Sequence, residues 1–257
     1  MKIVTLLENT TTRDDLTPQH GLSLYLETGT HRILFDMGQD DTFVKNAEKL
    51  GVDLSQVDIA IVSHGHYDHG GGLQTFLQIN QKAPVYLHAD AFGAYYNGTE
   101  KYIGLDPLLE SHPRLIFTKG TMEIADGLLL TDGNEQGWCF DSWGLNRREE
   151  DTFLADDFRH EQYLLIREGE KHILISGCSH KGIVNIARHF GADVLIGGFH
   201  LSKCEDTGKL QQIACQLLAE KTLYYTGHCT GSRQFAFLKD SMVDRLESLS
   251  TGVSIEA

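Results

Sequence analysis

The 257-residue sequence has few features of a membrane protein, a disulfide-bonded domain or a nucleic-acid-binding protein. No apolar run approaches the roughly 18 residues of a membrane-spanning helix, and the start, MKIVTLLENTTTRDD, does not resemble a signal peptide. The five cysteines are scattered without a Cys-x-x-Cys pair, so we expect no disulfide framework and a reducing, cytoplasmic location. Lysine and arginine number 22 against 36 acidic residues, and the net charge of −14 argues against binding a phosphate backbone.

Prolines are also rare, four in all, whereas the 26 glycines often stand where a short apolar run ends. Such runs predict buried strands, and they read RILFDMG, DIAIVSHGH, KHILISGC, VLIGGFH and TLYYTGHCTG. Helical patterns follow several of them, at residues 41–50, 73–80, 181–190 and 207–220. The alternation predicts a mixed α/β architecture, preceded by an antiparallel meander of KIVTLLEN, GLSLYLET and HRILFDMG.

We expect one domain over residues 1–257, because a chain of this length can bury a single large core. The stretch from about residue 97 to 159 follows neither pattern and holds both tryptophans and two acidic runs. A solvated insertion is one interpretation of this stretch, and a lid that shapes a substrate site is the other.

The densest group of chemically active side chains is SHGHYDHGGG, residues 63–72. His64, His66, Asp68 and His69 fall within six positions, directly after an apolar run. Neutral imidazoles and carboxylates are good ligands for zinc, iron or manganese, and residues two apart in an extended loop can point the same way. The motif therefore predicts that His64 and His66 share one metal ion, and that Asp68 and His69 turn toward a second.

Three further histidines each follow an apolar run: His180 in LISGCSH, His200 in LIGGFH and His228 in YYTGHC. Strand ends that meet at one edge of a sheet would bring these side chains to the motif. Cys178 precedes His180 by two residues and could contact a metal or be a buried, inert thiol.

Three more residues could orient a metal ligand or line a substrate pocket. Asp36 ends the run RILFD, where a carboxylate could hold a ligand histidine or simply form a turn. His160, in DDFRHEQYLLI, could be a further metal ligand or an exposed histidine beside acidic residues. His20, in QHGLSLYL, could line the pocket.

The pattern His-x-His-x-Asp-His after a strand, with an upstream aspartate and downstream histidines, resembles the metallo-β-lactamase superfamily. ILFDMG, ISGC and TGHC follow in the matching order, so the resemblance spans nearly the whole chain. These segments, together with GCSHKGIVNI and GGFHL, make the sequence similar to one branch of the superfamily. That branch is described as 7,8-dihydropterin-6-yl-methyl-4-(β-D-ribofuranosyl)aminobenzene-5′-phosphate synthase-like. The resemblance implies a four-layer αβ/βα sandwich with two metal ions at the sheet edges.

The resemblance also implies ligands residue by residue: His64 and His66 for one metal, and Asp68, His69 and His228 for the other, with Asp36 matching an aspartate that orients a ligand. The chain departs from the family after ILIS, where a metal-bridging aspartate is usual and this sequence reads GCSH. Cys178 could bridge the metals, or His180 could reach the site instead. The third histidine of the first metal is either His160 or His180.

The predicted reaction is hydrolysis by a metal-bound hydroxide at a site of two divalent ions, zinc first, with manganese or iron as alternatives. Asp68 is the predicted catalytic proton acceptor, and the expected substrate is a small molecule with an ester, lactone or phosphodiester bond.

The alternative implied by the branch is a C–N bond synthase for a phosphorylated pterin-like substrate, whose phosphate could meet Lys181, Arg147 or Arg148 unless these are merely solvated. No nucleic-acid or membrane partner is expected, and a homo-oligomer stays open.

Overall fold

The computed structural model describes all residues from Met1 to Ala257, and two seven-stranded sheets form its centre. The strands of the first sheet lie in the order β18 (Ser254–Glu256), β1 (Lys2–Leu7), β2 (Ser23–Glu27), β3 (Arg32–Phe35), β4 (Ile59–Ile61), β5 (Val85–His88) and β8 (Leu115–Thr118). Those of the second lie in the order β17 (Leu246–Ser248), β16 (Leu223–Thr226), β15 (Val194–Ile196), β14 (Lys171–Ile175), β13 (Tyr163–Glu168), β10 (Leu128–Thr131) and β9 (Thr121–Ala125).

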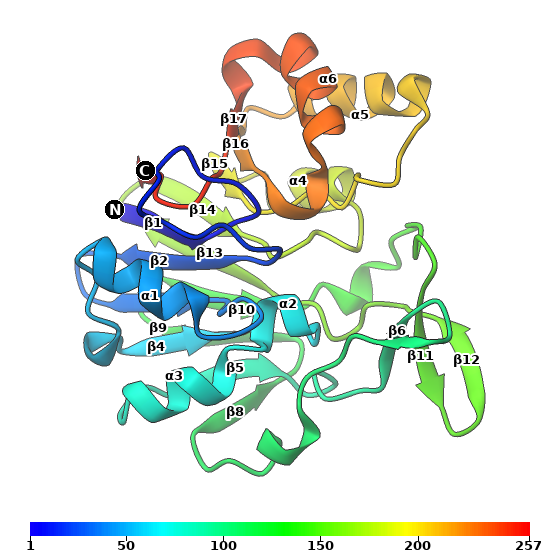
Figure 1. Ribbon diagram of the computed structural model, residues 1–257. Helices are drawn as coiled ribbons and strands as arrows, with labels where there is room; N and C mark the ends of the chain where they lie inside the picture. The colour runs from blue at the N-terminus through cyan, green and yellow to red at the C-terminus, as the bar shows by residue number, and fades with distance from the viewer.

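A small four-stranded sheet lies to one side of these two (Figure 1), in the order β12 (Thr152–Ala155), β11 (Leu145–Glu149), β6 (Tyr95–Asn97) and β7 (Lys101–Tyr102). The α-helices are α1 (Thr42–Lys49), α2 (Tyr67–Gly70), α3 (Leu73–Ile79), α4 (Ile183–Phe190), α5 (Thr207–Ala219) and α6 (Ser232–Met242). Single 3₁₀ turns cover Leu54–Gln56, Pro107–Leu109, Asn134–Gln136, His228–Thr230 and Val243–Arg245. None of the helices combines the length and apolar character needed to cross a membrane.

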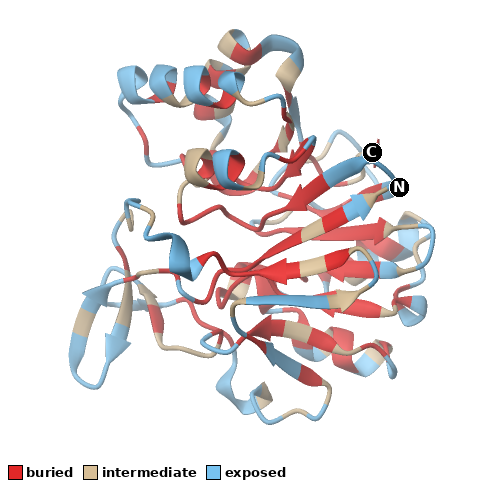
Figure 2. Cartoon of the chain, turned by 180° about the vertical axis from the view of Figure 1, so that it is seen from behind, coloured by how far each residue is buried: buried red, intermediate tan, exposed pale blue.

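The two large sheets face each other across an apolar layer of 18 buried residues, among them Phe35 and Ile61. On the outer side of the first sheet, α1 and α3 bury side chains such as Phe43 and Phe76. On the outer side of the second sheet, α4, α5 and α6 bury side chains such as Leu210. The buried strands thus lie between helices whose outer surfaces are exposed (Figure 2). The predicted mixed α/β class and four-layer sandwich are confirmed.

Most of the predicted elements are present. The first three strands form the expected antiparallel meander, from β1 to β2 to β3. The four helices predicted from the sequence correspond to α1, α3, α4 and α5. Several elements were not predicted, among them α6 and the last strand, β18, which pairs with β1 at the edge of the first sheet.

The stretch from about 97 to 159, expected to be an insertion or a lid, divides into two parts. Its middle contains β8, β9 and β10, which belong to the two large sheets. Its ends contain β7, β11 and β12, which leave the sandwich and form the small sheet with β6. The small sheet contributes Asn97, Lys101 and Leu145 to the wall of the main cavity. The stretch is therefore not one continuous insertion, because the fold itself requires its middle.

Parallel pairing brings several strand ends to the same edge of the sandwich. β3 pairs with β4 in parallel in the first sheet, and β14, β15 and β16 pair in parallel in the second. The carboxyl ends of parallel strands open at one edge of a sheet, where ligands commonly bind. The loops that follow these five strands carry most of the predicted metal-binding residues.

The packing of the core predicts how a substitution at Leu26 changes the free energy of unfolding. This side chain is fully buried between the sheets and pairs in register with Ile3 and Ile33. Leu26→Ala is expected to lower the free energy of unfolding by about 2–5 kcal/mol, through lost apolar contact and the cavity left behind. Leu108 is 86% exposed, so Leu108→Ala should change it by less than about 0.5 kcal/mol. Urea unfolding of both variants measures the difference, and equal midpoints would contradict this description of the core.

Candidate metal centre

Most of the predicted site residues lie on loops that follow parallel strands, whereas His20 precedes β2 and His160 precedes β13. Asp36 follows β3, and the motif residues 63–69 follow β4 and begin α2. The second sheet supplies four more: Cys178 and His180 after β14, His200 after β15 and His228 after β16. Both sheets therefore contribute side chains to one site.

The backbone of these loops is strained at four residues. Asp36, Ser179, His200 and His228 have φ angles of 60°, 56°, 50° and 49°. Residues with a Cβ atom rarely adopt this left-handed region, which costs on the order of 1–3 kcal/mol each. Such strain persists only where the surrounding structure holds it, and here it occurs in every loop that follows β3, β14, β15 and β16.

A cavity of about 640 Å³ opens at this edge, a volume suited to a small-molecule ligand. Its wall contains the following predicted site residues: His20, His66, Asp68, Cys178, His180, His200 and His228. Two cationic side chains, Lys101 and Lys203, also line it.

The three basic residues considered for a phosphate do not line this cavity. The Lys181 ammonium is buried elsewhere and donates to the carbonyl oxygen of Asp132 at 2.6 Å. Arg147 and Arg148 form ion pairs with acidic residues of the small sheet and its turn. These side chains are therefore not positioned to bind a phosphate next to the motif.

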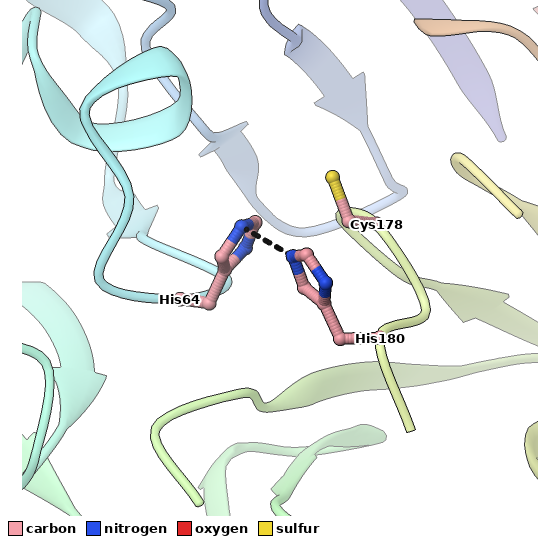
Figure 3. Close-up of side chains that lie close together, drawn as sticks. All are labelled: His64, Cys178 and His180. Carbon is pink, nitrogen blue, oxygen red and sulfur yellow. Dashed lines mark hydrogen bonds between the residues drawn. The ribbon is translucent and has the colours of Figure 1, made fainter. Parts of the chain in front are cut away.

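Two pairs of histidine nitrogens face each other inside the site. His64 Nε2 lies 3.2 Å from His180 Nε2 (Figure 3), and His69 Nε2 lies 3.1 Å from His228 Nε2. Cys178 lies close to both pairs: its Sγ is 3.1 Å from His69 Nε2, and it lies within 4.8 Å of the ring nitrogens of each pair. The site therefore has two groups of donor atoms, and both groups include Cys178.

Hydrogen bonds on the outer nitrogens fix the protons of His64 and His69. His69 Nδ1 lies 2.7 Å from Asp36 Oδ2, so Nδ1 carries the proton that the carboxylate accepts. Ser63 Oγ donates to the same carboxylate oxygen at 2.8 Å, and its oxygen is then free to accept from His64 Nδ1, also at 2.8 Å. When either ring is neutral, its Nε2 is unprotonated, and the lone pair points into the site.

His228 is held in the same way. Its Nδ1 lies 2.9 Å from Asn9 Oδ1, an oxygen that also accepts from the Gly21 N–H at 3.2 Å. His228 Nδ1 therefore donates, and its Nε2 presents a lone pair to that of His69. Two lone pairs at 3.1 Å repel unless a cation, a proton or a metal ion, lies between them. This donor set fits a metal ion, because the ligand atoms point inward and their outer nitrogens are already oriented.

The pKa values of the site histidines also agree with metal binding. Burial lowers the pKa of His66 to about 3, and burial and neighbouring histidines lower the pKa of His64 and of His180 well below the ordinary value. Burial also acts to lower the pKa of His69, but the carboxylates of Asp36 and Asp68 outweigh it and raise this pKa. The site thus offers neutral imidazoles and attracts positive charge at His69.

His160 does not face either group of donor atoms. Its Nδ1 accepts from the Gly65 N–H at 2.9 Å, and its Nε2 lies 3.1 Å from Asp156 Oδ2. Both ring nitrogens are occupied by these two contacts. Between the two histidines considered for the first group, His180 is therefore the one that meets His64.

Asp68 and His20 lie together at the wall of the cavity. Asp68 Oδ2 is 3.4 Å from His228 Nε2 and 3.1 Å from Nε2 of His20, whose side chain is 53% exposed. Burial acts to raise the pKa of Asp68, but His69, His20 and His228 lower it well below the ordinary value. Asp68 is therefore a carboxylate at neutral pH, and it contacts the partly exposed side chain of His20.

His200 lines the cavity without belonging to either donor group. Its ring centre lies 4.2 Å from that of His180, and its buried Nδ1 has no hydrogen-bond partner. Burial lowers the pKa of His200 to about 4, so the ring is neutral. Its position suits contact with a ligand in the cavity.

Three contact residues were missed from the sequence: Asn9, Ser63 and Asp156. Ser63 had a signal, because it begins the motif and precedes the first histidine directly. Asp156 stands in an acidic run that was interpreted as solvated, yet it is only 2% exposed. Asn9 has no local signal, since it contacts His228 across 219 positions.

Comparison with known proteins agrees with this geometry. The family model for the metallo-beta-lactamase superfamily matches residues 16–181. An uncharacterized protein of Methanocaldococcus jannaschii is 30% identical over 243 residues, which cover 89% of this chain and 91% of that protein. A 7,8-dihydropterin-6-methyl-4-(beta-D-ribofuranosyl)-aminobenzene-5′-phosphate synthase of the same organism is 27% identical over 265 residues, which cover 93% of this chain and 90% of that protein.

Among solved structures, a metal-dependent hydrolase of the beta-lactamase superfamily is similar over the whole chain. It is 30% identical with a TM-score of 0.85, and the match covers 100% of this chain and 99% of that one. The family model, the sequence relatives and the fold lead to the same assignment, which the motif and the strand order had predicted. The chain belongs to the metallo-β-lactamase superfamily.

Proposed function

We propose that this protein is a metal-dependent hydrolase of a small molecule, with two divalent metal ions at the edge of the sandwich. The residues that would hold the first ion are His64, His66 and His180, and those that would hold the second are Asp68, His69 and His228; Cys178 lies within reach of both groups. One observation carries this proposal: imidazole nitrogens face each other at 3.1 and 3.2 Å, and hydrogen bonds on the outer nitrogens orient His64, His69 and His228. Zinc is the first choice, with manganese or iron as alternatives.

Bound metal ions of this kind supply a water whose pKa is lowered toward about 7 and polarise a carbonyl or phosphoryl oxygen. The chain's own contribution is to orient the ligands and to handle protons. Asp68 is the proposed proton acceptor, because its carboxylate lines the cavity and lies beside His20. His20, at 3.1 Å from Asp68 and 53% exposed, is placed to pass that proton to solvent.

The proposed substrate carries an ester, lactone or phosphodiester bond. A cavity of about 640 Å³ with both polar and apolar walls suits such a molecule. The solved relative at 30% identity is described as a metal-dependent hydrolase, which supports hydrolysis as the reaction class.

A second candidate is a synthase that joins a pterin-like substrate to a phosphorylated amine: the new C–N bond replaces the bond between a pterin methyl carbon and a leaving group on that substrate, and the amine nitrogen loses a proton. The observation that favours it is the synthase relative, 27% identical over 93% of this chain. Lys101 and Lys203 in the cavity wall could meet a phosphate group. In this case the same residues would orient the metals, and no water would be consumed.

The metal assignment predicts the content of the purified protein and the effect of removing one ligand. Wild-type protein prepared without tag or chelator should contain about two zinc, manganese or iron ions per chain. His66→Ala should lose one of them, and turnover should fall by more than the roughly 10–100-fold that loss of an outer partner of a ligand costs. Elemental analysis and turnover of a hydrolysed substrate are the two measurements.

His172→Ala is the matched control for His66→Ala, because His172 is exposed and its side chain lies on β14 away from the donor groups. It should retain wild-type metal content and turnover. Unchanged metal and turnover in His66→Ala would remove His66 from the site. Wild-type protein that takes up no metal, even after reconstitution, would end the metalloenzyme proposal.

The two candidate reactions predict different products from the same protein. A hydrolase should cleave members of an ester, lactone and phosphodiester panel, and His66→Ala should abolish that activity. A synthase should instead join a phosphorylated ribosyl aminobenzene to a pterin substrate and require the phosphate. Mass spectrometry of both reactions distinguishes them, and a condensation product without hydrolysis would favour the second candidate.

A further inference from the structure

His66 differs from the other two histidines of the motif in how its ring is held. His64 and His69 each have a ring nitrogen fixed by a hydrogen bond, to Ser63 and Asp36. The Nε2 atom of His66 is buried and has no hydrogen-bond partner. A buried polar atom without a partner is costly, and a ring without an outer partner is poorly oriented for a metal.

A carboxylate lies beside this nitrogen. Asp156, the residue that follows β12, places Oδ2 4.0 Å from His66 Nε2, and it is 2% exposed. The other carboxylate oxygen accepts from the Phe158 N–H at 2.8 Å. The backbone N–H of Asp156 donates to the Leu145 carbonyl oxygen at 3.0 Å. Asp156 is thus fixed in place by contacts that do not involve His66.

His160 fixes the same carboxylate. Because His160 Nδ1 accepts from the Gly65 N–H, its proton is on Nε2, which donates to Asp156 Oδ2 at 3.1 Å. Burial acts to raise the pKa of Asp156, but His160 and His66 lower it below the ordinary value, so the group is ionised at neutral pH. With no free lone pair on His160, the cluster of His66, Asp156 and His160 does not form a third metal site, although its donor atoms lie within 4.8 Å.

We propose that Asp156 is the positioning residue of His66: its carboxylate accepts a hydrogen bond from His66 Nε2–H and leaves Nδ1 as the nitrogen that binds metal. This inference rests on the proposed function. The present 4.0 Å separation becomes a hydrogen bond after a shift of about 1 Å. His66 lines the cavity, whereas Asp156 does not.

The two proposed metals then depend on carboxylates from different parts of the fold. Asp36 follows β3 in the sandwich and holds His69, whereas Asp156 follows β12 in the small sheet and holds His66. The small sheet also supplies Lys101 to the cavity wall. A substrate that contacts the small sheet therefore contacts the element that orients a ligand of the first metal.

Asp156→Asn tests the role at nearly constant side-chain size. In a zinc titration of the apoprotein against a chromophoric chelator, one of the two zinc ions should bind roughly 10–100-fold more weakly than in the wild type. Asp157→Asn is the matched control, because Asp157 is 38% exposed and pairs with Arg159, and both zinc affinities should equal those of the wild type. Circular dichroism of the apoproteins verifies that each variant folds.

A double-mutant cycle with His66→Ala separates positioning from a general structural effect. If Asp156 acts through His66, adding Asp156→Asn to His66→Ala should change the affinity of the remaining zinc by less than about twofold. An equal loss in both backgrounds would show that Asp156 acts elsewhere and would overturn the assignment.

Nuclear magnetic resonance of the wild type tests the same point without any variant. In zinc-loaded protein with ¹⁵N-labelled histidine, long-range correlations should show His66 with a protonated Nε2 and zinc on Nδ1. Zinc on Nε2 would overturn the positioning role of Asp156 and leave the metal-dependent hydrolase intact. Wild-type protein that binds no zinc would overturn both proposals together.

Discussion

The site depends on holding imidazole nitrogens against one another in a buried space. His69 and His228 approach to 3.1 Å, and His64 and His180 to 3.2 Å. The contact between His69 and His228 is unfavourable without a cation, and burial removes the water that would otherwise solvate the lone pairs. Hydrogen bonds to the outer nitrogens orient three of the four rings before any ion arrives. The free energy of binding an ion would therefore add to the stability of the folded chain.

The two-sheet core is what makes such a site rigid. In each facing pair, one histidine comes from a loop of the first sheet and the other from a loop of the second, as with His64 and His180. The distance between the partners is thus set by the apolar layer that joins the sheets. The same packing offsets the left-handed backbone of Asp36, His200 and His228, at about 1–3 kcal/mol each. Stability and site geometry have a common origin in this layer.

Local patterns in the sequence were sufficient to predict the layers of the sandwich and the metal-binding motif. Short apolar runs that end in glycine predicted the buried strands, and four ligand types within six positions predicted the metal loop. Contacts across long separations could not be predicted in this way. Asn9 orients His228 across 219 positions, and the choice between His160 and His180 depends on one hydrogen bond from Gly65. Helix α6 was missed because its buried face includes the polar Gln234 beside Leu238 and Met242.

Cys178 bears on which metal the site would select. It takes the position where the family resemblance implies a bridging aspartate, and it belongs to both donor groups. Burial and the neighbouring Cys229 raise the pKa of its thiol well above the ordinary value, so a thiolate forms there only when a cation binds beside it. A thiolate is a softer ligand than a carboxylate and, together with imidazoles, suits zinc better than manganese. A cysteine in place of an aspartate at a shared position would therefore favour zinc over manganese, and binding of the ion there would release a proton.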